Sequence, residues 1–351
     1  MPQLLQGIGI DLLATKPTAQ IVKYAQLAEK AGIDEFWLGE NYHWFRRYGE
    51  EPRSAMTTAA AIALATSRIR LGLGIVSVYT RHPAILAMES YSLSELSQGR
   101  FTLGLGAAKM GVVHMGFDLQ NPLRTHRECI QLIRALLTGD EVNYSGEVFK
   151  LESPASEDHA RPNYRIPIVL GVTGPKLLQL AGETCDGLIL PTLTTPAYVT
   201  YAMEQVQVGA RRSGKSLEDF RVGATLISAV DKDGAAARDA VRKILATYFT
   251  NKLVNIKNDI LLQSASITNE EIQPIADAVL RNDYDHAMKL VTDDMIDRTV
   301  VAGTVEEVCE RLEDYAKAGL QIPLFVLWGN VQEGIKLLGS EVRSRLVKAA
   351  S

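Results

Sequence analysis

Residues 69–107 read IRLGLGIVSVYTRHPAILAMESYSLSELSQGRFTLGLGA, and this stretch decides the fold. Two short apolar runs, IRLGLGIVS (69–77) and FTLGLGA (101–107), flank a longer segment that has Pro83 near its start. Proline in the first turn of a helix costs no hydrogen bond, so 82–96 is predicted as a helix. Runs that are apolar on both faces are typical of strands in a parallel sheet covered by helices. The stretch therefore predicts a strand–helix–strand unit.

The same alternation of apolar run and helical pattern continues in both directions. The apolar stripe of 18–31 predicts a helix that ends at Gly32, because glycine readily takes the left-handed conformation of a helix end. Eight buried strands result, at 4–13, 34–40, 69–77, 101–107, 166–172, 186–191, 220–230 and 322–329. Further helices are expected at 52–66, at 124–137, from 175, from 196 and at 331–349. Eight such units predict an α/β fold of the closed (β/α)8 barrel (TIM barrel) type. A doubly wound open sheet is the alternative, although the glycine loop that usually follows its first strand is absent.

Two segments interrupt this rhythm. Residues 141–151 alternate in the manner of strands around Ser145 and Gly146, which predicts a short hairpin. Residues 250–300 read as helices with charged faces, inserted between the seventh and eighth strands. Long decorations of this kind often form lids or subunit contacts. No low-complexity linker divides the chain, so we expect one domain over residues 1–351.

The composition excludes several classes of function. The chain is 46% hydrophobic and 22% charged with a formal net charge of -4, which is typical of a globular protein with a large core. No basic cluster indicates a nucleic-acid partner, and no apolar run approaches the ~20 residues of a membrane span. Cys129, Cys185 and Cys309 lie far apart in the sequence and are expected to be free thiols in a reducing compartment. We therefore expect a cytoplasmic protein.

The residues at the ends of the strands are the candidates for an active site, because barrels carry their sites at the carboxyl ends of the strands. Asp11 and Glu40 end the first two runs. A buried carboxyl group that lacks a partner has a raised pKa and can act as a general acid. Alternatively, Asp11 caps a helix or pairs with a base, and Glu40 pairs with Arg46 or Arg47. His43 is either a cofactor contact or a surface histidine, and the absence of HxH and HxxxH spacing predicts no metal site.

The segment VLGVTGPKLLQLAGE (169–183) offers a place for a phosphate. A strand ends, two glycines free the backbone, and a helix begins at Pro175, with Lys176 adding positive charge. Unpaired N–H groups and the helix dipole favour an anion at such a start. The alternative is an ordinary helix start with Thr173 as its N-cap. The strand exit GLGAAK (104–109) resembles a dinucleotide loop but lacks the third glycine.

Several segments resemble the luciferase-like oxidoreductases, and their F420-dependent branch in particular. Residues 71–109 resemble the core signature of the family, with YTRHP (79–83) most like the F420-dependent members. GPKLLQLAGETCDGLIL (174–190) is similar to the phosphate-binding helix and the strand that follows it. Residues 123–151 resemble the helix and hairpin of the family, and 267–312 the C-terminal part of methylenetetrahydromethanopterin reductases. The segments occur in the family's order along nearly the whole chain.

This resemblance implies a barrel with coenzyme F420 in its mouth and hydride transfer at C5 of the deazaflavin. In the F420-dependent relatives, a non-proline cis peptide lies behind the ring at the end of the third strand, and Gly74–Ile75 is the matching bond. Asp11 and Glu40 are the catalytic candidates that supply or orient a proton. The implied cofactor-binding residues are Asn41, Gly74, Ile75, Val76, Gly106, Ala107, Ala108, Lys109, Gly171, Val172, Thr173, Gly174, Pro175 and Lys176.

Two departures from the family pattern narrow the expected reaction. Glu40-Asn41 stands where many relatives have an Asp-His pair, and Ala108-Lys109 stands where an acid follows the fourth strand. These departures argue against oxidation of alcohols or sugar phosphates and favour a methylenetetrahydromethanopterin-reductase-like reduction of a small molecule in one-carbon metabolism. The alternatives are an FMN-dependent monooxygenase and a non-catalytic flavin-binding relative. The resemblance also implies a homodimer, or a higher homo-oligomer, built on the second and third helices.

Overall fold

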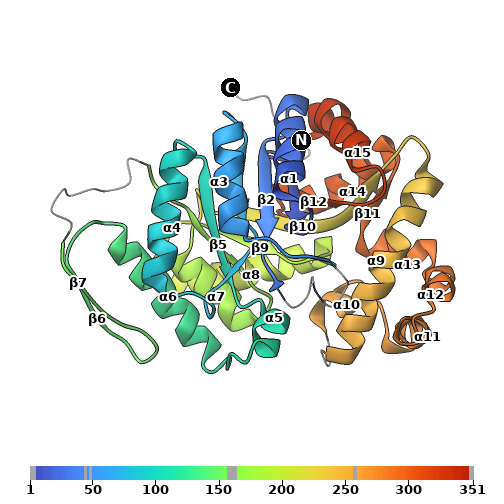
Figure 1. Ribbon diagram of the computed structural model, residues 1–351. Helices are drawn as coiled ribbons and strands as arrows, with labels where there is room; N and C mark the ends of the chain where they lie inside the picture. The colour runs from blue at the N-terminus through green and yellow to red at the C-terminus, as the bar shows by residue number, and fades with distance from the viewer. Residues whose placement is uncertain (1–4, 43–45, 47–49, 156–163, 256–258, 348–351) are drawn as a thin grey trace.

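The computed structural model describes residues 5–42, 46, 50–155, 164–255 and 259–347. Its centre is a barrel of parallel strands (Figure 1). The strands are β1 (Gly9–Leu13), β2 (Glu35–Gly39), β3 (Arg70–Leu73) continued by β4 (Val76–Ser77), β5 (Phe101–Gly106), β8 (Ile168–Gly171), β9 (Gly187–Leu190), β10 (Arg221–Val230) and β12 (Ile322–Leu327). Pairing of β12 with β1 and of β9 with β10 closes the sheet. The predicted (β/α)8 barrel is confirmed, and the open sheet is wrong.

Helices surround the barrel and bury one face each against it. They are α1 (Thr18–Ala31), α3 (Ala55–Ala65), α4 (Pro83–Leu96), α6 (Pro122–Leu136), α7 (Pro175–Thr184), α8 (Pro196–Ser213), α14 (Val305–Lys317) and α15 (Val331–Leu337). Local residues fix their ends. Gly32 ends α1 at φ 89°, and the His82 ring accepts a hydrogen bond from the Ala84 N–H at the start of α4. These two boundaries agree with the sequence patterns.

The last helix is less regular than its sequence pattern predicts. The pattern predicts one helix over 331–349, whereas α15 is followed by a π-helical turn (Leu338–Val342) and by α16 (Arg343–Leu346). Residues 348 and 349 lie outside the described residues. A second difference is α5 (Lys109–His114), a six-residue helix after β5 that the sequence analysis did not predict.

The third strand is divided in two. The sequence predicts one strand over 69–77, but the Gly74–Ile75 bond between β3 and β4 is cis. The predicted cis peptide is therefore confirmed at the predicted bond. β3 pairs with β2 and β5, whereas β4 pairs with β5 alone.

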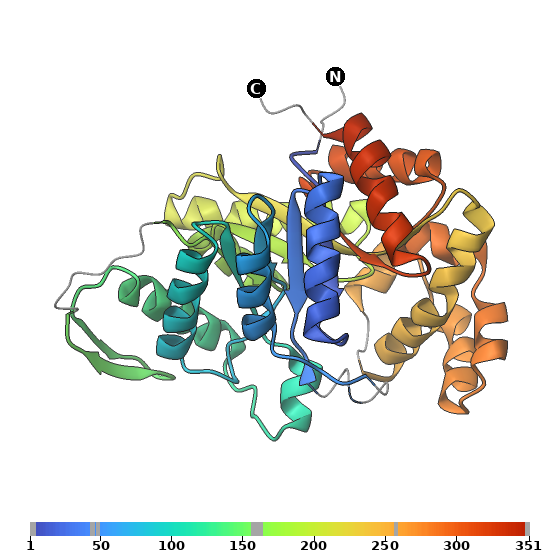
Figure 2. The same cartoon turned by 45° about the horizontal axis from the view of Figure 1, so that its top comes forward.

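The insertion between the seventh and eighth strands is helical, as predicted, but it begins earlier. It contains α9 (Gly234–Asn255), α10 (Ile260–Ser264), α11 (Asn269–Leu280), α12 (Tyr284–Leu290) and α13 (Asp293–Thr299). A short strand that was not predicted, β11 (Val301–Gly303), then pairs with the end of β10. Figure 2 shows these helices on one side of the barrel and the β6–β7 hairpin on the other.

The predicted hairpin is confirmed as β6 (Val142–Ser145) and β7 (Lys150–Ser153), which pair in antiparallel fashion. The buried carboxylate of Glu128, on α6, fixes the turn between β6 and β7. It accepts hydrogen bonds from the backbone N–H groups of Glu147, Val148 and Phe149 at 2.9–3.1 Å. Gly146 lies so close to this carboxylate that an added Cβ would be 2.3 Å from Oε2.

Candidate active site

A cavity of about 350 Å³ opens at the carboxyl ends of the strands, where the barrel fold predicts the site. We call it the mouth cavity. Its lining includes the predicted site residues Glu40, Asn41, Gly74, Ile75, Ala108, Lys109 and Gly171. Residues that follow β2, β3, β5 and β8 thus come together at one place, although they are far apart in the sequence.

The floor of the mouth cavity is built from glycines and one isoleucine. The Ile75 side chain lies against Gly106 and Gly171, where an added Cβ would be 3.0 Å and 2.5 Å from its carbon atoms. A Cβ on Gly39 would lie 3.3 Å from the Gly74 carbonyl oxygen. These close approaches need residues without side chains. The result is a floor with few side chains, on which a flat molecule can lie.

Glu40 is held by an arginine, as one of its two sequence interpretations predicts, but by a different one. Its carboxylate receives two hydrogen bonds from the Arg81 guanidinium, at 2.6 Å and 3.2 Å, and a third from the Ala55 N–H at 3.1 Å. Arg46 pairs instead with Glu51, and Arg47 lies outside the described residues. The pairing raises the pKa of the Arg81 guanidinium, chiefly through its hydrogen bond with Glu40. Arg81 therefore fixes the position of Glu40, which lines the mouth cavity.

Asp11 lies deeper than the sequence indicates. It is the third residue of β1, which ends at Leu13, and its side chain points into the barrel with 3% of its surface exposed. Oδ2 accepts a hydrogen bond from the Thr225 hydroxyl at 3.1 Å, and Oδ1 has no hydrogen-bond partner within the described chain. A Cβ on Gly74 would lie 4.0 Å from Oδ2, so Asp11 sits just below the floor. Among the described residues, Asp11 neither caps a helix nor pairs with a basic side chain, which were the alternatives to a catalytic role.

Burial raises the pKa of the Asp11 carboxyl group to about 7, because removal of water disfavours the charged form and the Thr225 hydrogen bond offsets this only in part. The unfolded chain loses this proton near pH 4. Between these two values the folded state binds more protons than the unfolded state. The contribution of Asp11 to stability therefore falls as the pH rises, until it levels off above about pH 7.

Replacement of Asp11 by asparagine should abolish this pH dependence, because the amide stays neutral. The free energy of unfolding of Asp11→Asn, relative to the unaltered protein, should rise by about 2 kcal/mol between pH 5 and pH 8. Denaturant unfolding at the two pH values measures this difference. If the difference in free energy of unfolding between the two proteins is the same at both pH values, the pKa of Asp11 is not raised by folding.

The predicted phosphate site lies at the start of α7, beside the mouth cavity. Gly174, not Thr173, is the N-cap of α7, and no side chain accepts its first N–H groups. The interpretation of Thr173 as a side-chain cap is therefore wrong; its carbonyl oxygen instead accepts a hydrogen bond from the Tyr198 hydroxyl at 2.8 Å. A Cβ on Gly174 would meet nothing within 4 Å, and Pro175 and Lys176 are exposed. The helix start thus has open space in front of it.

Some predicted residues do not reach the mouth cavity with their side chains. Val76 and Val172 are buried in the core of the barrel, with 0% and 6% of their surfaces exposed. The Ala107 carbonyl oxygen accepts a hydrogen bond from the Ser77 hydroxyl at 2.9 Å. His43, for which the sequence left two interpretations, lies outside the described residues.

One wall of the mouth cavity comes from α9, in the insertion. Tyr248, Asn251 and Lys252 line it from successive turns of this helix. The Lys252 ammonium group pairs with the Asp259 carboxylate at 2.7 Å. These residues were not predicted as site residues from the sequence, and neither were Leu13 and Gly39 of the same lining. Their spacing of three and four residues places them on one helix face, but many other faces of the chain share that spacing.

The described ranges contain no group of three or more His, Cys, Asp or Glu side chains that could hold a metal ion. Within the same ranges, no helix is both long and apolar enough to cross a membrane. All three cysteines are buried free thiols.

Comparison with known proteins agrees with the resemblance in the sequence. A profile of the luciferase-like monooxygenases matches residues 4–321. The 5,10-methylenetetrahydromethanopterin reductase of Methanolobus tindarius is 30% identical over 95% of this chain and 98% of its own length. The reductase of the same name from Archaeoglobus fulgidus is 30% identical over 96% and 99%. The solved structure of the coenzyme F420 dependent tetrahydromethanopterin reductase from Methanopyrus kandleri matches with a TM-score of 0.85, at 28% identity and over 97% of this chain and 99% of that one. The chain belongs to the luciferase-like monooxygenase family.

Proposed function

We propose that this protein is an F420-dependent oxidoreductase that transfers a hydride between C5 of the deazaflavin and a small organic acceptor. The reaction most similar to its own is that of a 5,10-methylenetetrahydromethanopterin reductase, which acts at a carbon–nitrogen group. The observation that carries this proposal is the mouth cavity with its glycine floor, together with the start of α7, which follows Gly171 of that floor and has no side-chain cap. The full-length similarity to F420-dependent reductases supports the same cofactor.

The residues of the mouth cavity fit a deazaflavin. The absence of side chains at Gly74 and Gly171, which are half-buried in the lining, allows a flat ring system to approach the backbone closely, and Ile75 would support it from below. The phosphate of the cofactor would meet the first N–H groups of α7, where Gly174 leaves room and Lys176 adds positive charge. When bound, the cofactor supplies the hydride donor or acceptor, which no side chain can supply.

Asp11 is the residue that we propose to hold the proton of the reaction. Its raised pKa, near 7, keeps both the protonated and the ionised form populated at neutral pH. Its Oδ2 lies 4.0 Å from the position of a Cβ on Gly74, and its Oδ1 has no hydrogen-bond partner among the described residues. Glu40 is fixed by Arg81, so we propose that it positions groups at the wall rather than exchanging protons. Asn41 and Lys109 would contact the bound molecules from the same wall.

Binding of three cofactors to the purified protein tests the proposal. Titration with F420 should give saturable binding at one site per chain, and FMN and NADPH should bind at least ~100-fold more weakly, a gap of about 3 kcal/mol. FMN is the alternative cofactor. Tight binding of FMN, with oxygen consumption by its reduced form, would replace our proposal with a monooxygenase function. Binding of F420 without turnover of any acceptor would support a non-catalytic relative.

We also propose that two copies of the chain associate through α3 and α4, which lie side by side (Figure 1). Large apolar side chains are exposed on both helices: Leu64 of α3 at 73%, and Ile85 and Met88 of α4 at 43% and 59%. Exposed apolar groups on adjacent helices are typical of a protein contact surface. A cytoplasmic location and a role in one-carbon metabolism are consistent with the free thiols and with the proposed reaction.

Replacement of Leu64 by glutamate should weaken this dimer by at least ~10-fold, because a charge would be buried at the contact. Sedimentation velocity of the unaltered protein and of Leu64→Glu would measure the change. Leu280→Glu is the matched control, since Leu280 is also 58% exposed but lies on α11. If both variants weaken the dimer equally, or if neither weakens it, the contact does not lie on α3 and α4.

A further inference from the structure

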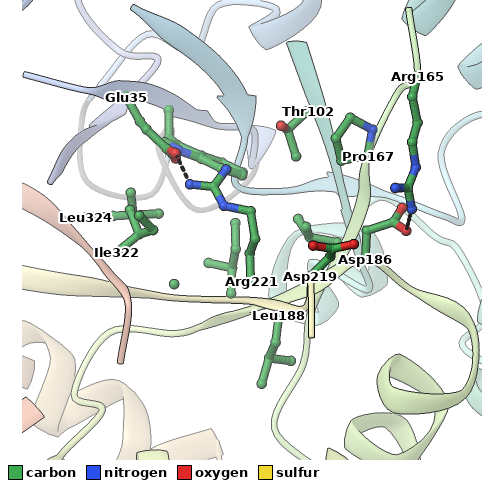
Figure 3. Close-up of a pocket in the computed structure, with 14 residues that line it drawn as sticks. Glu35, Thr102, Arg165, Pro167, Asp186, Leu188, Asp219, Arg221, Ile322 and Leu324 are labelled. Carbon is green, nitrogen blue, oxygen red and sulfur yellow. Dashed lines mark hydrogen bonds and ion pairs between the residues drawn. The ribbon is translucent and has the colours of Figure 1, made fainter. Parts of the chain in front are cut away.

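A second cavity lies inside the barrel at the end opposite to the mouth. It has a volume of about 160 Å³, and we call it the rear chamber. Its lining includes the first residues of β2, β10 and β12, namely Glu35, Arg221 and Ile322. It shares no lining residue with the mouth cavity. Figure 3 shows these side chains converging from strands all around the barrel.

Trp37 separates the two cavities. Its indole ring lines the rear chamber, and its other side lies 3.4 Å from the position of a Cβ on Gly74, in the floor of the mouth cavity. The ring also covers Gly72, where an added Cβ would be 2.2 Å away. The indole N–H donates a hydrogen bond to Glu35 at 2.8 Å. The ring is therefore fixed, and the rear chamber, which opens toward the solvent beside Arg165 and Asp219, is separate from the mouth cavity.

Gly223 lines the rear chamber, and the space at position 223 would admit a small side chain. A Cβ on Gly223 would meet its neighbours at 3.5–3.7 Å, which is ordinary contact distance, so packing does not require glycine there. Gly72 and Gly187 in the same barrel differ, since a Cβ at either would come within 2.5 Å of other atoms. Empty apolar space loses van der Waals contacts that a larger side chain would regain. The presence of glycine at 223 thus leaves room for an occupant.

The walls and the polar groups of the rear chamber define the chemistry of that occupant. The walls are mainly apolar side chains, among them Trp37, Leu188, Ile189 and Leu324. Thr102 is buried, with 6% of its surface exposed, and its hydroxyl makes no hydrogen bond to any described residue. A volume of about 160 Å³ is close to the ~150 Å³ of an apolar cavity that admits benzene. A single six-membered ring with a small polar substituent would fit.

Most of the charges around the rear chamber are already paired, and Asp219, an exposed carboxylate in its lining, has no ion pair with a described residue. Glu35 pairs with Arg221, and Asp186 pairs with Arg165 (Figure 3). Asp186 also pairs with Arg134. A charged ligand would have to compete with these ion pairs and lose its own water, which is costly. The occupant should therefore be neutral.

We propose that the rear chamber binds a small neutral aromatic molecule with one hydroxyl group, of the phenol class. The ring would lie against Trp37, Ile189 and Leu324, and the hydroxyl would form a hydrogen bond with Thr102. This site is independent of the cofactor and of the reaction proposed for the mouth cavity.

Titration of the full-length protein with 4-fluorophenol, followed by fluorine NMR, tests this proposal. The unaltered protein should bind one molecule per chain. Gly223→Leu should fill the chamber and weaken binding at least ~10-fold, whereas Gly223→Ala, the matched control, should change it less than ~3-fold. Circular dichroism would establish that each variant is folded.

A second substitution keeps the test decisive if Gly223→Leu does not fold. Thr102→Val removes the hydroxyl at nearly constant shape and should weaken phenol binding ~5-fold, the effect of one hydrogen bond, while benzene binding stays unchanged. Absence of saturable binding to the unaltered protein would overturn the proposal. So would binding that a folded Gly223→Leu leaves unaltered, or equal effects of Thr102→Val on phenol and benzene.

Discussion

Replacement of Asp11 by asparagine should lower turnover by ~10²–10³-fold while the dissociation constant of F420 changes less than ~3-fold. The amide has nearly the shape of the carboxyl group but cannot exchange a proton near neutral pH, and positioned proton transfer contributes about that factor. Asp11 lies beneath the floor of the mouth cavity rather than in its lining, so its loss should not disturb cofactor contacts. Steady-state kinetics and a cofactor titration on the same preparation would separate the two effects.

Asp219→Asn is the matched control for this experiment. Asp219 is an exposed aspartate at the opposite end of the barrel, so its replacement should leave turnover unaltered. Unchanged turnover in Asp11→Asn would show that Asp11 takes no part in the reaction. An equal loss of turnover and of F420 affinity would instead assign it to binding.

Replacement of Gly174 by aspartate should weaken F420 binding at least ~100-fold without loss of stability. Gly174 has φ −79°, a conformation open to any residue, and its Cβ would project into open space. Aspartate at an N-cap accepts hydrogen bonds from the first N–H groups and is favoured by the helix dipole. It would occupy the donors that we assign to the cofactor phosphate and repel the phosphate charge. Each charge-assisted hydrogen bond lost is worth about 1.5–3 kcal/mol, so two are sufficient for this effect.

Calorimetric titration with F420 and thermal unfolding of the same variant would check both halves of this prediction. Gly174→Ala is the control, because it adds a Cβ in the same place without a carboxylate. Its affinity for F420 should stay within ~3-fold of the unaltered protein. If Gly174→Asp binds F420 with unaltered affinity, the cofactor phosphate does not bind at the start of α7.

The elements of the fold could be predicted from the sequence because they depend on local signals. Helix α1 begins and ends where its apolar stripe and Gly32 predict, and α4 begins where Pro83 predicts. Short elements could not be predicted, because they lack such local signals. β11 has three residues and α5 has six, too few for a periodic pattern to emerge. The apolar run 69–77 gave no local sign that β3 stops at Leu73.

The candidate site could be predicted only where strand order determines it. The ends of β2, β3, β5 and β8 meet because parallel strands of a barrel end at one rim, so Gly74, Ile75 and Gly171 were identified. The depth of Asp11 depends on how far β1 extends, which an apolar run does not reveal. The partner of Glu40 is Arg81, 41 residues away, rather than a neighbouring arginine. Which face of α9 turns toward the mouth depends on tertiary packing alone.

Transfer of deuterium tests the central claim most directly. F420 reduced with deuterium at C5 would be mixed anaerobically with methylenetetrahydromethanopterin and the purified protein, and the products analysed by mass spectrometry. We expect one deuterium per molecule in the methyl product, with stoichiometric oxidation of the cofactor. Oxidation of the cofactor that needs oxygen, or a product without deuterium, would contradict our account.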